Sequence, residues 1–251
     1  GAIANGLAAA GGYVPVVSTF LVFHDYMRPA VRLAALMGLQ VIYAYTHDSV
    51  FVGEDGPTHQ PVETLAALRT IPNLVTLRPA DLTETCAAYA VALGRTKAPT
   101  ALALTRQNVP ELARPAGMDA FAAVAKGGYV LSPESASLQV ILIATGSEVH
   151  LAMGAQAELE RSGYGARVVS MPSLELFDAQ NAEYRSEVLP PAVPKLCIEA
   201  GSRLPWLRFV GERGDVVSID TFGASAPDKV LAKEFGLTVD NVVARARHLM
   251  S

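Results

Sequence analysis

The sequence predicts an α/β protein made of two consecutive, mainly parallel-sheet domains with helices on both faces of each sheet. Short β-branched runs alternate with helical runs, and the strand runs are almost wholly apolar, as expected of strands that are buried on both faces. This alternation stops between Asn108 and Leu138, where proline, glycine and serine interrupt the chain. We therefore expect a first domain over residues 1–115, a linker over residues 116–137 and a second domain over residues 138–251.

The expected elements follow one another in strand–helix order. The segment from Gly1 has the apolar residues of the last turns of a helix, which Gly11 and Gly12 end. Runs of β-branched and aromatic residues predict strands at Val14–Thr19, Gln40–Tyr45, Leu74–Leu77, Thr100–Thr105, Gln139–Ala144, Ala166–Ser170, Lys195–Glu199 and Val216–Ile219. Helical periodicity predicts helices at Arg28–Met37, Val62–Leu68, Leu82–Leu93, Glu148–Ser162, Pro227–Phe235 and Asn241–Leu249.

The strand that ends at Ala144 leads through a Thr-Gly-Ser turn into an alanine-rich helix. Ser147 is the predicted N-cap of that helix, with Glu148 in its first turn. A glycine turn before a helix can bind phosphate, but the sequence has neither a G-x-G-x-x-G motif nor a Walker lysine here. We interpret this turn as an ordinary strand-to-helix connection.

The composition argues against several classes of function. Hydrophobic residues make up 51% and charged residues 18% of the 251 residues, which predicts a folded chain with an ample core. The net charge of -4 and the absence of a long lysine/arginine block argue against a nucleic-acid partner. No apolar run approaches the ~20 residues that cross a membrane. The two cysteines, Cys86 and Cys197, give neither a disulfide framework nor a metal-ligand spacing, so we expect reduced thiols in the core.

The densest polar cluster spans residues 46–63, with the sequence THDSVFVGEDGPTHQPVE, and directly follows a predicted buried strand. Ligands of parallel sheets bind outside the carboxyl ends of the strands, and the glycines and proline of this loop predict a rigid path. A solvated turn explains poorly why two histidines and two aspartates, His47, Asp48, Asp55 and His59, lie in one rigid loop. Because the HExxH spacing and cysteine ligands are absent, we expect no metal site here.

A second cluster, STFLVFHDYMRPAVRLAAL, places Phe20, Phe23 and Tyr26 at intervals of three residues after a predicted strand. Such spacing is most often a core stripe, and the alternative is a flat aromatic wall for a planar heterocycle. In the third cluster, TALALTRQN, Arg106 follows a buried strand and points to the same crevice. Its guanidinium suits a phosphate or carboxylate ligand, or equally an ion pair with a neighbouring acid.

The three clusters closely resemble the transketolase family. The string GEDGPTHQPVE is specific to it, and the segments GGYVL, ATGSEVHLA, RVVSMPS, SIDTFGASAP and GLTVDNVVARA follow in the family's order, so that the resemblance covers essentially all 251 residues. It implies a transferase that moves a two-carbon ketol unit between sugar phosphates with thiamine diphosphate and Mg²⁺. Dihydroxyacetone synthase is similar as well and stays an alternative. Residues 1–115 would then be part of a pyrimidine-binding domain, and residues 138–251 the C-terminal domain.

The resemblance also implies roles for the site residues. The aminopyrimidine ring of the cofactor would bind among Phe20, Phe23 and Tyr26. These side chains would bury the ring, which helps the amino group of the ring to act as a base. Asp55 would accept a hydrogen bond from a sugar hydroxyl. His59 would lie near the reacting ketol carbons as the catalytic hydrogen-bond or proton-transfer partner. The terminal phosphate of the sugar would be held by His47 and Arg106.

Other parts of the family's site have no counterpart in this sequence. The family's catalytic glutamate would belong a few residues before Gly1, and the GDG…N motif, which supplies the metal ligands, would belong to a missing N-terminal domain. We therefore expect this chain alone to be inactive and to have the N-terminal half of the enzyme as a partner. The family also implies a homodimer, the pentose phosphate pathway and a cytoplasmic location. The alternative of another class is a non-catalytic binding or oligomerisation module.

Overall fold

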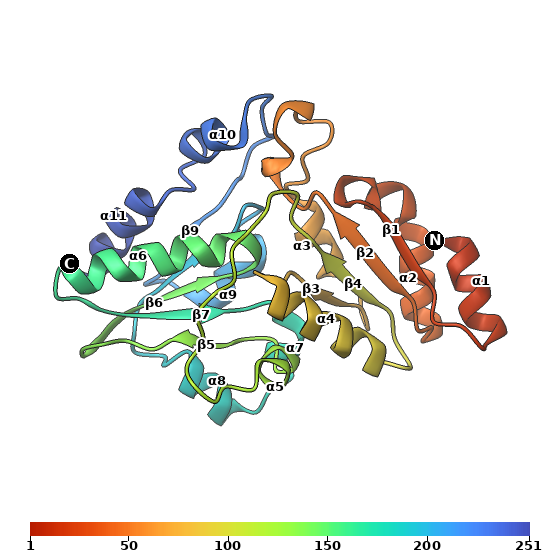
Figure 1. The fold of residues 1–251 in the computed structure, drawn as a ribbon, viewed down its shortest axis with the longest axis horizontal. Helices are drawn as coiled ribbons and strands as arrows, with labels where there is room; N and C mark the ends of the chain where they lie inside the picture. The colour runs from red at the N-terminus through yellow and green to blue at the C-terminus, as the bar shows by residue number, and fades with distance from the viewer.

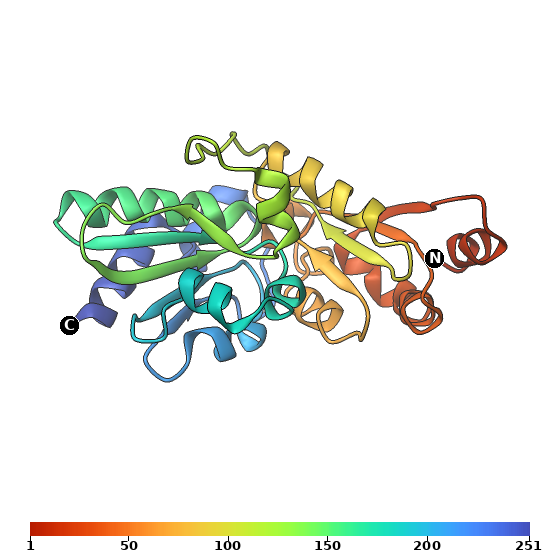
Figure 2. The same cartoon turned by 90° about the horizontal axis from the view of Figure 1, so that it is seen from below.

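The computed structural model describes residues 1–251 and contains two sheets that lie side by side, with the two termini at opposite ends of the molecule (Figures 1 and 2). The first sheet has the order β1-β2-β4-β3 and is wholly parallel. Because Phe20 pairs with Thr46 and Tyr45 with Ala103, the carboxyl ends of three strands meet at one edge. The strands are β1 (Val16–Phe20), β2 (Ile42–Thr46), β3 (Val75–Leu77) and β4 (Thr100–Ala103).

Helices cover both faces of the first sheet because its strands are apolar on both sides. Tyr43 and Ala101 face the cluster formed with α1 (Ala2–Ala10), α2 (His24–Met37) and α3 (Thr64–Leu68). Ile42 and Leu102 face the opposite way, into the cluster that contains α4 (Leu82–Gly94). That second cluster continues into the other sheet, so the two sheets share one hydrophobic core.

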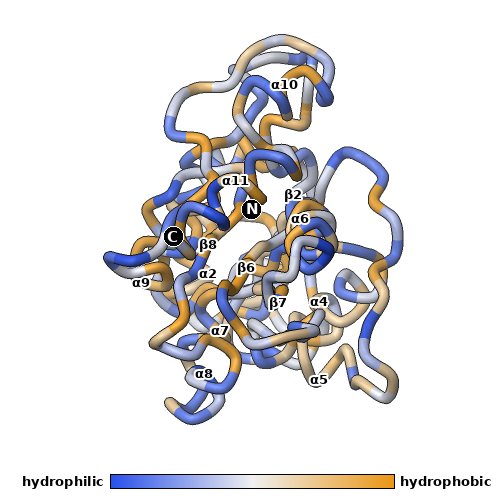
Figure 3. The backbone as a smooth tube through the Cα atoms, turned by 90° about the vertical axis from the view of Figure 1, so that its left-hand side faces the viewer, coloured by the Kyte–Doolittle hydropathy of each residue, from blue (hydrophilic) through white to orange (hydrophobic).

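The second sheet has five strands in the order β5-β7-β6-β8-β9, and its edge strand β5 runs antiparallel to β7. Figure 3 shows hydrophobic residues along its central strand β6, with hydrophilic stretches in the outer loops. The strands are β5 (Tyr129–Ser132), β6 (Leu138–Ala144), β7 (Gly165–Ser170), β8 (Lys195–Ile198) and β9 (Asp215–Val217). One face packs on α6 (Val149–Arg161) and α11 (Val239–Met250), and the other on α7 (Leu174–Asp178), α8 (Ala182–Val188) and α9 (Leu207–Val210).

Shorter elements complete the fold. Helix α5 (Ala120–Ala125) packs on α4, and α10 (Asp228–Glu234) packs on the 3₁₀ segment η2 (Val50–Asp55) of the first domain. Three further 3₁₀ segments are η1 (Leu21–Phe23), η3 (Gly146–Glu148) and η4 (Leu204–Trp206). No helix is both long and apolar enough to cross a membrane.

The predicted fold class is confirmed, and all eight predicted strands are present with boundaries shifted by at most two residues. Residues 116–137, the predicted linker, contain α5 and β5, because a short β-branched run pairs with β7 at the edge of the sheet. The division between the domains stays a prediction. Helix α2 begins at His24, four residues before the predicted start.

Two local predictions were wrong. Ser147 is not an N-cap, because η3 precedes α6 and the Ser147 hydroxyl instead donates to the carboxylate of Glu148 at 2.6 Å. Cys86 is exposed on α4, whereas Cys197 is buried as expected, and both are free. The core cannot take Cys86 because this position lies on the outward face of its helix.

Candidate active site

The carboxyl edge of the first sheet gathers residues from all three polar and aromatic clusters. Phe20 ends β1, and His47 follows β2 with a φ of 59°, a left-handed conformation that turns the chain sharply. The side chains of these two residues stack, with ring centroids 3.6 Å apart and planes 15° apart. The parallel register therefore places an aromatic ring and an imidazole from distant segments in direct contact.

The aromatic cluster is open to solvent on one side. Phe23 lies in η1, 6.2 Å from the ring of Phe20, and Tyr26 lies a further 6.2 Å from Phe23, in α2. Phe23 also meets the imidazole of His59 edge-on at 5.6 Å. Tyr26 is 87% exposed, which is incompatible with a stripe of core residues. The spacing of three thus produces an aromatic wall that faces outward.

The loop after β2 is held in shape by its own backbone. The hydroxyl of Ser49 caps η2 by accepting from the amide of Phe51, and Gly53 and Gly56 have φ values of 86° and 80°. This path brings Asp55 to the lining of a pocket of about 220 Å³ together with Arg106. Both side chains are exposed, and neither makes a salt bridge within the chain. The alternative in which Arg106 forms an ion pair with a neighbouring acid is therefore not realised in this structure.

The charges of this crevice act on His47. Burial lowers the pKa of His47 and nearby Arg106 lowers it further, while Asp55 and Asp48 oppose the shift. His47 is therefore a neutral imidazole at neutral pH, with its Nδ1 paired to the Thr46 hydroxyl at 2.9 Å. The Nδ1 of His59 similarly pairs with the Thr58 hydroxyl at 3.0 Å. A neutral imidazole can donate one hydrogen bond and accept another.

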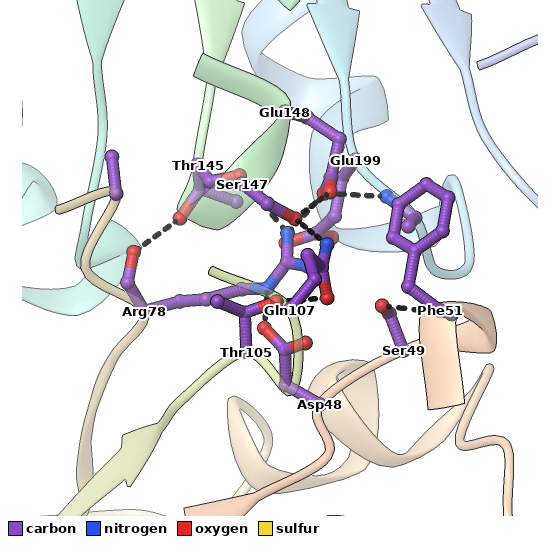
Figure 4. A network of polar contacts seen from close by, with 12 residues as sticks. Asp48, Ser49, Phe51, Arg78, Thr105, Gln107, Thr145, Ser147, Glu148 and Glu199 are labelled. Atoms are coloured by element: carbon purple, nitrogen blue, oxygen red, sulfur yellow. Dashed lines mark hydrogen bonds and ion pairs between the residues drawn. The ribbon is translucent and has the colours of Figure 1, made fainter. Parts of the chain in front are cut away.

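A second polar cluster begins at Asp48 in the same loop (Figure 4), and the carboxylates of Asp48, Glu148 and Glu199 in it are buried. Arg78, with no exposed surface, donates to Asp48 Oδ2 at 2.7 Å, to the carbonyl of Thr145 at 3.0 Å and to Glu148 Oε2. Glu199 accepts two bonds from Arg69, at 2.6 and 2.8 Å. Asp48, Arg69 and Arg78 belong to the first sheet's domain and the two glutamates to the second, so this network joins the domains.

Glycine is required where the two domains meet at Arg78. Gly146 has a φ of 59°, and a Cβ there would lie 2.7 Å from the guanidinium carbon of Arg78. The amide of Gly146 donates to the Arg78 carbonyl at 3.0 Å. The Thr-Gly-Ser turn, interpreted from the sequence as an ordinary connection, thus packs against the guanidinium of the other domain. No group of three or more His, Cys, Asp or Glu side chains is placed to hold a metal ion.

Comparison with known proteins identifies the family of both domains. Residues 1–111 match the family described as "Transketolase, pyrimidine binding domain", and residues 127–238 match "Transketolase-like TK C-terminal domain". The chain belongs to the transketolase family. The transketolase of Geobacillus stearothermophilus is 56% identical over the whole chain, and transketolase 1 of Escherichia coli is 50% identical over 99% of it. The chain spans about 38% of the length of the first and 37% of the second.

Solved transketolase structures have the same fold. The transketolase from Leishmania mexicana superimposes with a TM-score of 0.92 at 47% identity, over 99% of this chain and 36% of that one. A split-gene transketolase described as an inactive beta4 tetramer superimposes with a TM-score of 0.80 at 26% identity, over 99% of this chain and 80% of that one. This chain thus matches four fifths of the length of that split-gene chain, against about a third of the Leishmania chain.

Sequence reasoning missed the residues that connect the crevice to the second domain. Pro227 and Asp228 line the same pocket as Asp55 and Arg106, although they lie in the second domain. Arg78 and Gln60 carried no distinctive pattern of their own. The signal that could have found Gln60 is its place in the family string GPTHQPVE, just as the segment SIDTFGASAP leads directly to Asp228.

Proposed function

We propose that this chain supplies the cofactor-ring wall and the sugar-phosphate subsite of a transketolase, which transfers a two-carbon ketol unit between sugar phosphates. The observation that carries the proposal is the convergence of Phe20, Phe23, His47 and His59 in ring-to-ring contact at one sheet edge, beside a pocket that Asp55 and Arg106 line. Aromatic rings and a free guanidinium are the groups that a planar heterocycle and a phosphate require.

The aromatic wall fits the aminopyrimidine ring of thiamine diphosphate. Tyr26 is 87% exposed and Phe23 is half-buried, so both offer apolar ring surface that the chain itself leaves uncovered. Thiamine diphosphate, when bound, supplies the nucleophilic carbon for cleaving and forming the carbon–carbon bond of the ketose. Phe20, Phe23 and Tyr26 exclude water from the heterocycle and fix its orientation.

The remaining residues bind and orient the sugar. Arg106 provides a permanent charge and a fork of donors for the terminal phosphate, and His47 adds one neutral donor beside it. Asp55 accepts from a sugar hydroxyl and thereby reads its stereochemistry. His59, held edge-on by Phe23, donates to or exchanges a proton with the oxygens of the ketol unit, which makes it the catalytic residue of this chain.

The proposal extends to groups outside these 251 residues. Mg²⁺ and the diphosphate of the cofactor would be held by an N-terminal half that also supplies the activating glutamate, so the chain alone is inactive. The complete enzyme would be a cytoplasmic homodimer of the pentose phosphate pathway. A dihydroxyacetone synthase-like reaction uses the same crevice and differs in the acceptor aldehyde.

A second candidate is a non-catalytic binding or oligomerisation module. The observation that favours it is the similarity to the split-gene chain, which is described as an inactive beta4 tetramer. A module of this kind does not need the crevice residues. The two candidates therefore differ in whether Arg106 and His47 matter for sugar-phosphate binding.

Calorimetry with xylulose 5-phosphate and with unphosphorylated xylulose separates them. We expect the wild-type chain to bind the phosphorylated sugar more tightly, and Arg106→Gln to lose about 2 kcal/mol of that preference, the worth of charged hydrogen bonds. Arg32→Gln, on the outer face of α2, is the matched control and should bind as the wild type does. The proposal is contradicted, and the module favoured, if the wild-type chain binds both sugars equally tightly. The same holds if Arg106→Gln and Arg32→Gln bind xylulose 5-phosphate equally tightly.

A further inference from the structure

The loop that carries Asp55 lies against a segment of the second domain. Figure 1 shows the loop of η2, in orange, beside α10, in blue, at the top of the molecule. The segment Gly223–Asp228, which leads into α10, is the part of the second domain that meets this loop. The family strings that contain Gln60 and Gly223 thus lie together, although 163 residues separate them.

Gln60 fastens the two domains at this point. Its side chain is 2% exposed, and its Nε2 donates to the carbonyl of Gly53 in the loop at 2.8 Å and to the carbonyl of Ala224 in the second domain at 2.9 Å. The hydroxyl of Ser225 donates to the carbonyl of Glu54 at 2.6 Å. Two hydrogen bonds therefore join the loop to the other domain, and the bond to Gly53 fixes the side chain of Gln60 within the loop.

Gly223 is required by space at this contact. A Cβ at this position would lie 1.8 Å from the Oε1 of Gln60, closer than any packing allows. The φ of Gly223 is not in the left-handed region, so the backbone conformation itself would accept another residue. Glycine here thus serves chiefly the close approach of Gln60, since the next nearest side chain, Val50, would lie 3.3 Å from the Cβ.

The consequence for the crevice is a wall made by the second domain. Pro227 and Asp228 line the pocket of about 220 Å³ together with Asp55 and Arg106. This volume is below the roughly 300–1,000 Å³ of complete small-molecule sites, so it suits the phosphate end of a sugar. The position of this wall sets how far the phosphate end of a sugar can extend past Arg106.

We propose that the segment Gly223–Asp228, held in place by Gln60, determines which length of sugar phosphate the crevice accepts. The inference rests on the proposed function, and it assigns to the second domain a part in specificity. Gln60 is a positioning residue, because it acts through Gly53 and Ala224. Asp228 is the specificity-determining side chain, because it faces the pocket itself.

The contact is tested without a ligand by hydrogen exchange of the loop amides. Gly223→Ala should push Gln60 away and speed the exchange of the Gly56 amide, which is bonded to the carbonyl of Gly53, by about tenfold. In a Gln60→Ala chain the clash partner is gone, so adding Gly223→Ala should have little further effect. If Gly223→Ala speeds the exchange of the Gly56 amide equally in the wild type and in Gln60→Ala, then the contact with Gln60 is not the cause.

The specificity is tested by affinities for xylulose 5-phosphate and sedoheptulose 7-phosphate. Asp228→Ala enlarges the pocket and should shift the ratio of the two affinities about tenfold toward the longer sugar, the effect of a change of one methylene or more. Lys229→Ala, the neighbouring exposed residue, should leave the ratio unchanged. A wild-type chain that binds neither sugar contradicts the proposed function and this inference together. Wild-type binding with a ratio that Asp228→Ala does not change contradicts the inference alone.

Discussion

His47 and Asp48 are neighbours in sequence, yet their side chains belong to two opposite kinds of charged cluster. His47 joins the open crevice, where Asp55 and Arg106 are exposed and make no salt bridge in the chain. Asp48 joins the buried network, where Arg78 has no exposed surface and contacts two carboxylates. The exposed charges without a salt bridge can bind a ligand, whereas the buried and paired charges stabilise the fold.

The comparison shows that residue type alone does not identify a functional site. Both clusters contain arginine and acidic residues next to the same loop, and burial and pairing distinguish them. Burial disfavours the charge on Arg78, but Asp48 and Glu148 outweigh it and raise the pKa of Arg78, which keeps the guanidinium charged, while burial raises the pKa of its partner Glu148. In the crevice no such pairing fixes Arg106. Its charge is therefore available to a phosphate.

Removing Arg78 should have the largest effect on stability. Arg78→Met leaves Asp48 and Glu148 buried without a counter-charge, and breaking a buried pair in this way costs about 3–5 kcal/mol. We expect that loss in the free energy of unfolding measured with urea. Arg106→Met, the matched variant in the crevice, should change it by less than about 0.5 kcal/mol. A comparable loss in both variants would break the distinction between the two clusters.

A second variant tests the same network from the other domain. Gly146→Ala brings a Cβ to 2.7 Å from the Arg78 guanidinium in addition to the strain of a φ of 59°. Gly163→Ala is the control, because Gly163 has a φ of 85° but no atom near its would-be Cβ. Strain alone costs of order 1 kcal/mol. We expect Gly146→Ala to cost more, and an equal loss would show that the contact with Arg78 is loose.

The next effect concerns a buried histidine outside the crevice. His24 has no exposed surface, and burial together with Arg28 lowers its pKa to about 4 from 6.5. Because the folded pKa is below the unfolded one, the chain should be fully stable above about pH 6.5 and lose stability as the pH falls toward 4. The shift corresponds to roughly 3 kcal/mol. Urea unfolding across this range should show a steeper slope in the wild type than in His24→Gln, whose remaining slope comes from groups such as His47 and Glu199, whose pKa values are also lowered in the folded chain.

Much of the first sheet could be predicted because its strands are mostly apolar and three of them, β1, β2 and β4, lead into the three clusters. The parallel register then brings the cluster ends together, which is why Phe20 and His47 could be placed at one edge before their contact was known. The aromatic stripe could not be resolved from spacing alone, since a core stripe and an exposed wall have the same period. Exposure of Tyr26 decides between them.

The contacts between the domains could not be predicted from the sequence, because they depend on how the two domains are placed relative to each other. Arg78 follows a short strand and shows no sign of its partners, which lie in segments 30 and 70 residues away. β5 went unpredicted because a four-residue edge strand resembles the loop around it. Pairing across a sheet and pairing across a domain junction are both long-range, and local pattern carries little of either.

The smallest and most specific effect is expected at His47. Arg106→Gln removes a positive charge that lowers the pKa of His47, so that pKa should rise, whereas Asp55→Asn should lower it. The crossed control is Arg28→Gln, which should raise the pKa of His24 and leave His47 unchanged, because Arg28 acts on His24. NMR titration of the imidazole protons measures both residues in one sample. If Arg106→Gln and Asp55→Asn move the pKa of His47 in the same direction, then the three side chains do not share one electrostatic environment, and the crevice is not a single site.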